Sequence, residues 1–206
     1  MPKVWQKYVK SGSLSGLWRI SESVSELKEL YTLGEPEVFV REDRARQWLA
    51  SRILLQDLVR EFGYAGAFSL TKQPDGRPVL SVPGIHVSIS HAGDYAAVAV
   101  GDSPIGIDVE KLGQRVQRIR QKFMNVGEIA QLQDEADTDW MHVVWSAKEA
   151  LFKFHPEGNI DFREHLHLKK MQEGMLAAEI RKDGEQMKLQ VPYEQFDSYI
   201  IAWAFE

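Results

Sequence analysis

Residues 104–110 read PIGIDVE, and their alternation of apolar and acidic side chains is typical of a β-strand. Ile105, Ile107 and Val109 would share one face of this strand, and Asp108 and Glu110 would share the other. Side chains two residues apart on a strand lie roughly 6.5–7 Å apart. Two carboxylates at that spacing can approach one hard cation, whose charge relieves their repulsion. A bare Asp-x-Glu pair is more often a solvated strand end, so the pair alone does not establish a metal site.

A second polar cluster lies at residues 145–153, WSAKEALFK, where strong helix formers without glycine or proline indicate an α-helix. Trp145, Glu149 and Lys153 are spaced i, i+4 and i+8 and therefore form one stripe. Taken alone, Glu149 and Lys153 are an ordinary surface ion pair, and Trp145 is expected to anchor the helix. Lys148 lies about 100° around the helix from Glu149. Lys148 would serve as a control for this stripe if it merely faced solvent or a partner protein.

A third cluster lies at residues 87–93, VSISHAG, where a strand pattern runs into a turn. Adjacent residues on a strand project to opposite sides, and the sequence has no G-x-S-x-G motif here. Ser90 and His91 are therefore a poor nucleophile and base, and a hydrolase is disfavoured. A hydroxyl beside an imidazole suits phosphate binding, while a turn serine and a half-buried histidine are an equally good reading of the pair alone.

The rest of the chain alternates helical and strand patterns. A capping box at residues 23–26 opens a short helix, and apolar spacing predicts a long helix over residues 42–62. Further helical segments are predicted at residues 115–123 and 139–154. Strands are predicted at residues 17–20, 67–70, 86–89, 95–100, 105–109, 166–169, 175–180, 187–191 and 199–205. Residues 101–104 read as a hinge, which divides the chain into residues 1–102 and 103–206. The halves share an order of elements, so we predict an α+β fold of two similarly built halves.

Composition narrows the function classes. The chain has 206 residues, 44% of them hydrophobic, enough for one generous domain or two small halves. It has no apolar run of membrane-spanning length and no secretory signal pattern, so we expect a soluble cytoplasmic protein. Zero cysteines exclude disulfides, thiolate zinc and a cysteine nucleophile. The net charge of −5 disfavours nucleic-acid binding and with it a metal-dependent nuclease.

Four motifs in order resemble the signature of the 4′-phosphopantetheinyl transferases, of the surfactin-synthetase-activating type. They are GRP at residues 76–78, SISH at 88–91, GIDVE at 106–110 and WSAKEALFK at 145–153. The resemblance covers about residues 41–153 and weakens on both sides. It implies a monomer of two α/β halves related by a pseudo-twofold axis, with the active site at their interface.

The resemblance also implies roles for individual residues. The predicted ligands of Mg²⁺ are Asp108, Glu110 and Glu149, and the predicted catalytic residues are Asp108, Glu149 and Lys153. The predicted contacts to coenzyme A (CoA) are Arg41, Arg46, Arg77, Ser90, His91 and Lys153, with Arg44 able to replace either of the first two arginines. Glu149 is the first choice for the base, directly or through a metal-bound water, and Glu110 is the alternative. The role of Glu128 and the N-terminal contacts to CoA stay open.

The implied reaction moves the 4′-phosphopantetheine arm of CoA to a serine of an acyl or peptidyl carrier protein, with Mg²⁺, and releases adenosine 3′,5′-bisphosphate. Fixed positive charge from Arg77, Lys153 and the arginines at residues 41–46 suits the phosphates of CoA. The alternative is a catalytically silent CoA-binding relative, which is disfavoured because all three carboxylates and Lys153 are present. The sequence does not identify the carrier protein, because its recognition depends on surface contacts outside the motifs.

Overall fold

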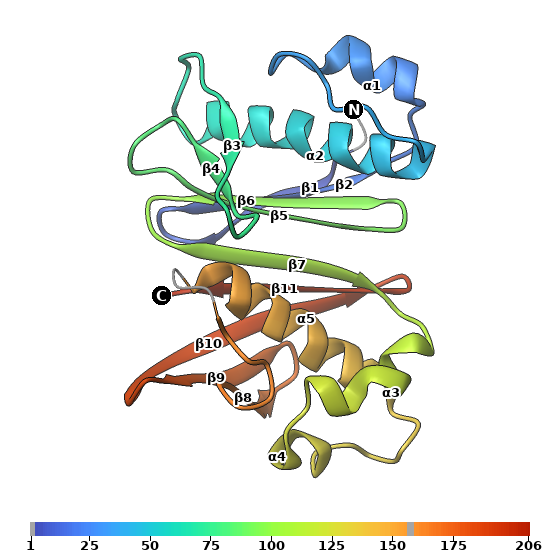
Figure 1. Ribbon diagram of the computed structural model, residues 1–206, viewed down its shortest axis with the longest axis vertical. Coiled ribbons are helices and arrows are strands. Elements are labelled where there is room, and N and C mark those ends of the chain that lie inside the picture. The colour runs from blue at the N-terminus through green and yellow to red at the C-terminus, as the bar shows by residue number, and fades with distance from the viewer. Residues whose placement is uncertain (1–2, 156–158) are drawn as a thin grey trace. The chain divides into compact units, whose positions relative to one another are not determined.

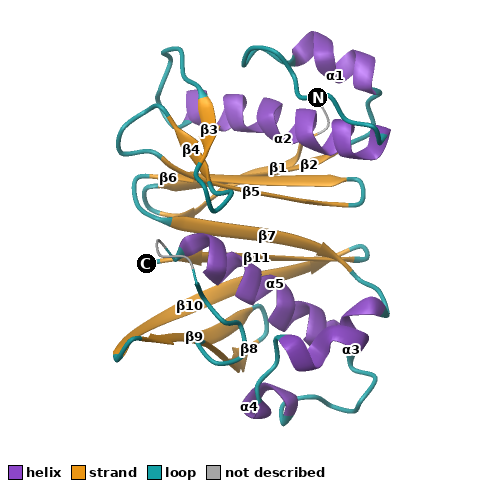
Figure 2. Cartoon of the chain, in the orientation of Figure 1, coloured by secondary structure: helices purple, strands orange, loops and turns teal. Residues whose placement is uncertain are grey.

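The computed structural model describes residues 3–155 and 159–206. The chain forms two compact units, Met1–Ile105 and Gly106–Glu206, so the division falls inside the strand that follows the predicted hinge. Each unit combines a sheet with a long helix, which confirms the predicted α+β fold of two sheet-rich halves (Figure 2). No helix in the described part of the chain is long and apolar enough to cross a membrane.

The first unit is a four-stranded antiparallel sheet with a long helix along one face (Figure 1). Its strand order is β1 (Lys3–Lys10), β2 (Ser13–Arg19), β6 (Tyr95–Gly101) and β5 (His86–Ala92). The long helix is α2 (Glu42–Glu61), and the capped helix α1 (Val24–Leu30) packs against it. The strands β3 (Leu70–Lys72) and β4 (Pro78–Leu80) form a separate hairpin.

The second unit is a five-stranded sheet with the helix α5 (Thr138–Phe154) packed against it (Figure 1). Its strand order is β7 (Ile105–Lys111), β11 (Tyr199–Phe205), β10 (Glu185–Phe196), β9 (Met175–Lys182) and β8 (Leu166–Gln172). Between β7 and α5 come α3 (Arg115–Ile119), the 3₁₀ helix η1 (Arg120–Lys122) and α4 (Val126–Ile129). Buried side chains of α5, among them Val144, Ala147 and Leu151, form the core with the sheet.

Gly106 determines how closely α5 approaches β7. A Cβ atom added at this glycine would lie 1.9 Å from the carbonyl oxygen of Ala150 in α5. Real side chains do not tolerate such a contact, so any other residue would push the helix away from the strand. The glycine of the GIDVE motif is therefore a packing requirement for the close contact between the two elements that carry the predicted carboxylates.

Several local predictions were wrong or incomplete: the strand predicted at residues 17–20 spans Ser13–Arg19, and neither β4 nor α4 was predicted. The strand predicted at residues 67–70 lies at Leu70–Lys72, because the turn at residues 73–77 sets the register and pairs Lys72 with Pro78. The strand Lys3–Lys10 was not predicted, since its three lysines mask the apolar alternation and its order depends on pairing with β2. The long helices and the strands from His86 onward were predicted to within a few residues, apart from longer ends on β8 and β10.

Candidate active site

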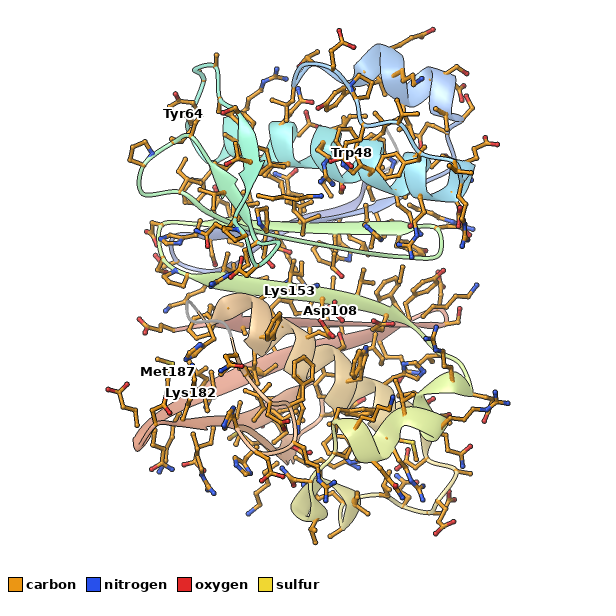
Figure 3. The ribbon with its side chains drawn as sticks, in the orientation of Figure 1. Trp48, Tyr64, Asp108, Lys153, Lys182 and Met187 are labelled. Carbon is orange, nitrogen blue, oxygen red and sulfur yellow. The ribbon has the colours of Figure 1, made fainter. Side chains whose placement is uncertain are left out.

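The carboxylate face of β7 meets α5 through an ion pair in the second unit. Lys153 Nζ lies 2.7 Å from Asp108 Oδ1 and donates a second hydrogen bond, of 3.1 Å, to the carbonyl oxygen of Ile107. Figure 3 shows the two labelled side chains close together between strand and helix. Asp108 is buried, at 3% exposure. Two residues that the sequence places 45 positions apart are thus brought together, with Asp108 held by the last turn of the helix.

Trp145 holds the second carboxylate of the strand. Its indole Nε1 donates a 3.0 Å hydrogen bond to Glu110 Oε1. The indole ring packs against Phe123, at a centroid distance of 5.0 Å, and against Phe162, at 5.6 Å. Trp145 therefore anchors the helix as predicted and, in addition, orients Glu110. Sequence reasoning missed this second role, although the position of Trp145 in the same stripe as Glu149 was the available signal.

The cluster carries more negative than positive charge. Burial raises the pKa of Glu110 to about 7, helped by the charges of Asp108 and Glu149 and opposed by Trp145 and Lys153. Burial and then the charge of Asp108 raise the pKa of Glu149 to about 7 as well, against the opposing charge of Lys153. Three carboxyl groups thus share one ammonium group. Their mutual repulsion favours a further cation when all three are ionised.

These residues fit a divalent cation by kind and by charge. The site offers carboxylate oxygens, the ligands that Mg²⁺ prefers, and the chain has no cysteine for softer metals. Within residues 3–155 and 159–206, no group of three or more His, Asp or Glu side chains converges on one point closely enough to hold a metal ion. Lys153 and Trp145 hold Asp108 and Glu110 instead. The predicted metal role of Asp108, Glu110 and Glu149 stays a prediction.

Lys148 cannot serve as an exposed control, because it does not face solvent. Its side chain is fully buried, and its Nζ lies 2.7 Å from Glu128 Oε2, also fully buried. Nζ donates further hydrogen bonds to the carbonyl oxygens of Phe123, at 2.7 Å, and Phe162, at 2.6 Å. The physical reason is that chain segments outside α5 cover this flank of the helix, and helical spacing alone does not reveal them.

Glu128, whose role the sequence left open, is a buried structural centre. It accepts hydrogen bonds from the backbone N–H of Asn125, at 2.8 Å, and of Leu168, at 3.0 Å, besides the one from Lys148. Burial raises the pKa of Glu128 and lowers that of Lys148, and their mutual attraction opposes both shifts. Because the partners in these hydrogen bonds either donate to the carboxylate of Glu128 or accept from the ammonium group of Lys148, they favour the charged forms of both side chains.

The remaining predicted residues lie in the first unit. Ser90 is buried and His91 is half-buried on β5. Arg77 pairs with Asp75 in the turn between β3 and β4, and exposed Arg41 pairs with Asp43. Such pairs cost little to break, because partly exposed ion pairs contribute little stability. These arginines are therefore able to exchange their carboxylate partners for another anion.

Arg46 has a structural task instead. It donates hydrogen bonds to the carbonyl oxygens of Ile20, at 2.8 Å, and Glu22, at 2.9 Å. These contacts tie α2 to the segment before α1, so a phosphate at Arg46 would have to compete with them. The predicted roles of all five residues toward CoA stay predictions, as does the placement of the site between the halves.

Comparison with known proteins gives two family matches. Residues 104–204 match the 4′-phosphopantetheinyl transferase superfamily, and residues 40–101 match the 4′-phosphopantetheinyl transferase N-terminal domain. The matched region therefore extends beyond Lys153, where the resemblance of the motifs weakens.

Three curated relatives illustrate the similarity. A 4′-phosphopantetheinyl transferase of Bacillus subtilis is 30% identical over 118 residues, covering 55% of this chain and 53% of that protein. The 4′-phosphopantetheinyl transferase psf-1 of Bacillus pumilus is 30% identical over 122 residues, covering 55% and 52%. The 4′-phosphopantetheinyl transferase Sfp of Bacillus subtilis strain 168 is 30% identical over 120 residues, covering 53% and 54%.

The chain spans about half the length of the curated relatives it matches. The two family matches nevertheless run from residue 40 to residue 204 and include every motif on which the sequence prediction rested. The predicted family is confirmed, and the chain belongs to the 4′-phosphopantetheinyl transferase superfamily.

Proposed function

We propose that the protein transfers the 4′-phosphopantetheine arm of CoA to a serine hydroxyl of an apo acyl or peptidyl carrier protein, with Mg²⁺. The observation that carries this proposal is the cluster on β7 and α5, in which Asp108, Glu110 and Glu149 share the single ammonium group of Lys153. Family membership supports the same activity, because the relatives bear the name of this transferase.

The proposed reaction is a substitution at phosphorus. The serine oxygen forms a bond to the β-phosphorus of CoA, the bond from that phosphorus to the bridging oxygen breaks, and adenosine 3′,5′-bisphosphate leaves. The hydroxyl proton passes to a carboxylate. Glu149 and Glu110, each with a pKa raised to about 7, are suited to accept it near neutral pH. Glu149 remains the first choice, because Trp145 already donates to Glu110.

Lys153 is proposed to stabilise charge on the pyrophosphate. Its Nζ is held by Asp108 and by the Ile107 carbonyl group, so it is fixed in place before substrate binds. A bound Mg²⁺, held by Asp108, Glu110 and Glu149, would neutralise pyrophosphate charge. Asp108 then has two tasks, since it positions Lys153 and supplies a carboxylate to the cluster.

The first unit is proposed to hold the phosphates of CoA. Ser90 and His91 offer a hydroxyl and an imidazole at the end of β5, while Arg77 and Arg41 form partly exposed ion pairs with the neighbouring aspartates Asp75 and Asp43. Guanidinium groups bind phosphate with paired N–H donors. Arg46 is the weakest member of the predicted set, because its N–H groups already serve two carbonyl oxygens.

The test is an intact-mass measurement on a panel of apo acyl and peptidyl carrier proteins after incubation with CoA and Mg²⁺. We expect the mass of at least one carrier to rise by one phosphopantetheine arm, and a carrier with its acceptor serine changed to alanine to stay unmodified. Chelation should abolish transfer. No mass increase in any carrier would contradict the transferase, and full activity in excess chelator with verified metal removal would contradict the metal requirement.

A further inference from the structure

Lys148 joins three segments that are separate in the sequence. Its ammonium group donates to the carbonyl oxygen of Phe123 after η1, to Glu128 in α4, and to the carbonyl oxygen of Phe162 before β8. An ammonium group has three N–H donors, so each of them has an acceptor. The side chains of Lys148 and Glu128 are both fully buried, so no water competes for these bonds.

The two carbonyl groups belong to the two phenylalanines that pack on Trp145. The ring centroids of Phe123 and Phe162 lie 5.0 and 5.6 Å from that of Trp145, and the Phe123 pair meets edge to face. The indole N–H of Trp145 holds Glu110. A continuous set of contacts therefore runs from Lys148, through the backbone and rings of the two phenylalanines, to a carboxylate of the proposed site.

Glu128 anchors Lys148, at the end of this set of contacts that lies away from Glu110. Its carboxylate accepts from the backbone of Asn125 and Leu168, so the partner of Lys148 is itself anchored to α4 and to the outer strand β8. Asn125 and Gln131 also bond the backbone of β8, at Leu166 and at Leu168 and Lys170. The ion pair is thus attached to a covered sheet edge rather than to a loose loop.

We propose that Lys148 and Glu128 are positioning residues that set the place of Glu110 through Phe123, Phe162 and Trp145. The inference rests on the proposed function for its catalytic consequence, but the contacts themselves do not depend on it. Proteins pack densely, so a shift of either phenylalanine backbone passes directly to the indole between their rings. A reacting group displaced by about 1 Å can lose roughly 10²-fold in rate, which makes such a shift measurable.

The test follows the indole N–H signal of Trp145 in ¹⁵N-labelled protein, assigned by its absence in Trp145→Phe. In Lys148→Met and in the milder Glu128→Gln, we expect this signal to move and its proton to exchange several-fold faster. Lys169→Met, the same change at an exposed lysine of β8, should leave the signal in place. The turnover number kcat should fall about 10- to 100-fold in Lys148→Met, with the Michaelis constant for CoA nearly unchanged.

A role limited to holding α4 and α5 together would change the melting temperature and leave the indole signal alone. The double variant Lys148→Met/Glu128→Leu separates the two roles, because apolar replacement of a buried ion pair is often neutral or stabilising. We expect it to fold with its indole signal still displaced, since the carbonyl groups of Phe123 and Phe162 have lost their donor. If Lys148→Met does not fold, Phe162→Leu tests the same route from the ring side and should move the same signal.

An unmoved indole signal and unchanged kcat in folded Lys148→Met or in the double variant would overturn the proposal. The outcome is distinguishable from failure of the proposed function, because the signal is read from the free protein. A displaced signal in a protein that modifies no carrier would leave the positioning role standing and remove the transferase. Carrier modification with an unmoved signal would support the transferase and remove the positioning role.

Discussion

Two lysines five residues apart on α5 make ion pairs of the same length with opposite character. Lys148 lies 2.7 Å from Glu128 and Lys153 lies 2.7 Å from Asp108. Both side chains of the first pair are fully buried, whereas Lys153 keeps 24% of its side-chain surface exposed. The distance between the two charges therefore does not show the role of an ion pair. The groups that surround the pair do.

The difference lies in the balance of charge and hydrogen bonding. Around Lys148, three donors meet three acceptors and one carboxylate meets one ammonium group. Around Lys153, Asp108 is accompanied by Glu110 and Glu149, whose pKa values are both raised to about 7. A balanced pair is a structural centre, while an unbalanced cluster retains charge that a ligand can neutralise.

The largest expected effect is loss of stability at the balanced pair. Lys148→Ala leaves the carboxylate of Glu128 buried without its counter-ion, which should lower the free energy of unfolding by about 3–5 kcal/mol. Lys153→Ala should lower it less, because Lys153 faces water in part. Denaturant unfolding of both variants, with Lys169→Ala as the exposed control, measures the difference. Equal losses of unfolding free energy in Lys148→Ala and Lys153→Ala would contradict the distinction between the two pairs.

The next largest effect should appear in the rate of transfer. Here Lys153 should matter more than Lys148, which is the opposite of their expected effects on stability. Lys153→Ala removes a fixed positive group from the reacting phosphates, so single-turnover rates should fall on the order of 10²–10³-fold. CoA affinity should fall less. Glu149→Gln keeps the shape of the side chain but removes its charge, and should reduce the rate at least as far while the protein stays folded. Near-normal rates in both variants would make the stripe an ordinary surface ion pair.

The smallest expected effect concerns the first unit and compares two ligands. CoA at about 100 times its dissociation constant should stabilise the fold by about 2.7 kcal/mol, a rise of several degrees in melting temperature. Dephospho-CoA, which lacks the 3′-phosphate, should give a smaller rise, and His91→Ala should remove the difference. Arg44→Ala is a cleaner second variant than Arg46→Ala, whose lost bonds to Ile20 and Glu22 alter the fold itself. Equal shifts for the two ligands in the unmutated protein would remove the 3′-phosphate role.

The same comparison shows what the sequence could predict. The alternation of PIGIDVE and the spacing of Trp145, Glu149 and Lys153 are local patterns, so the strand and the helical stripe could be read directly. Their meeting depends on Gly106, which lets the Ala150 backbone approach β7. The spacing within either element does not show that the strand and the helix meet. That they do was predicted only from the resemblance of the motifs to the family.

The second flank of α5 could not be predicted in this way. A helix sequence gives the angle of Lys148 but not what covers it, and here the covering groups come from Phe123, Glu128 and Phe162. Glu128 lies in a helix of four residues, too short to leave a periodic pattern. The helical stripe did place Trp145 on the same face as Glu149, but its bond to Glu110 was missed because that bond depends on the packing of α5 against β7.

The most direct test of the unbalanced cluster is a calorimetric Mg²⁺ titration in buffers of different ionisation enthalpy, which counts the protons released on binding. The folded pKa values of Glu110 and Glu149, about 7, exceed the ordinary value of 4.5, so the metal-free protein loses stability as pH rises from 4.5 to 7. Because a metal binds ionised carboxylates, Mg²⁺ should release protons below about pH 7 and almost none at about pH 9. Glu149→Gln should weaken binding and reduce the release, while Lys169→Met should change neither. Binding without proton release at the lower pH, or no binding in the presence of CoA, would contradict the account.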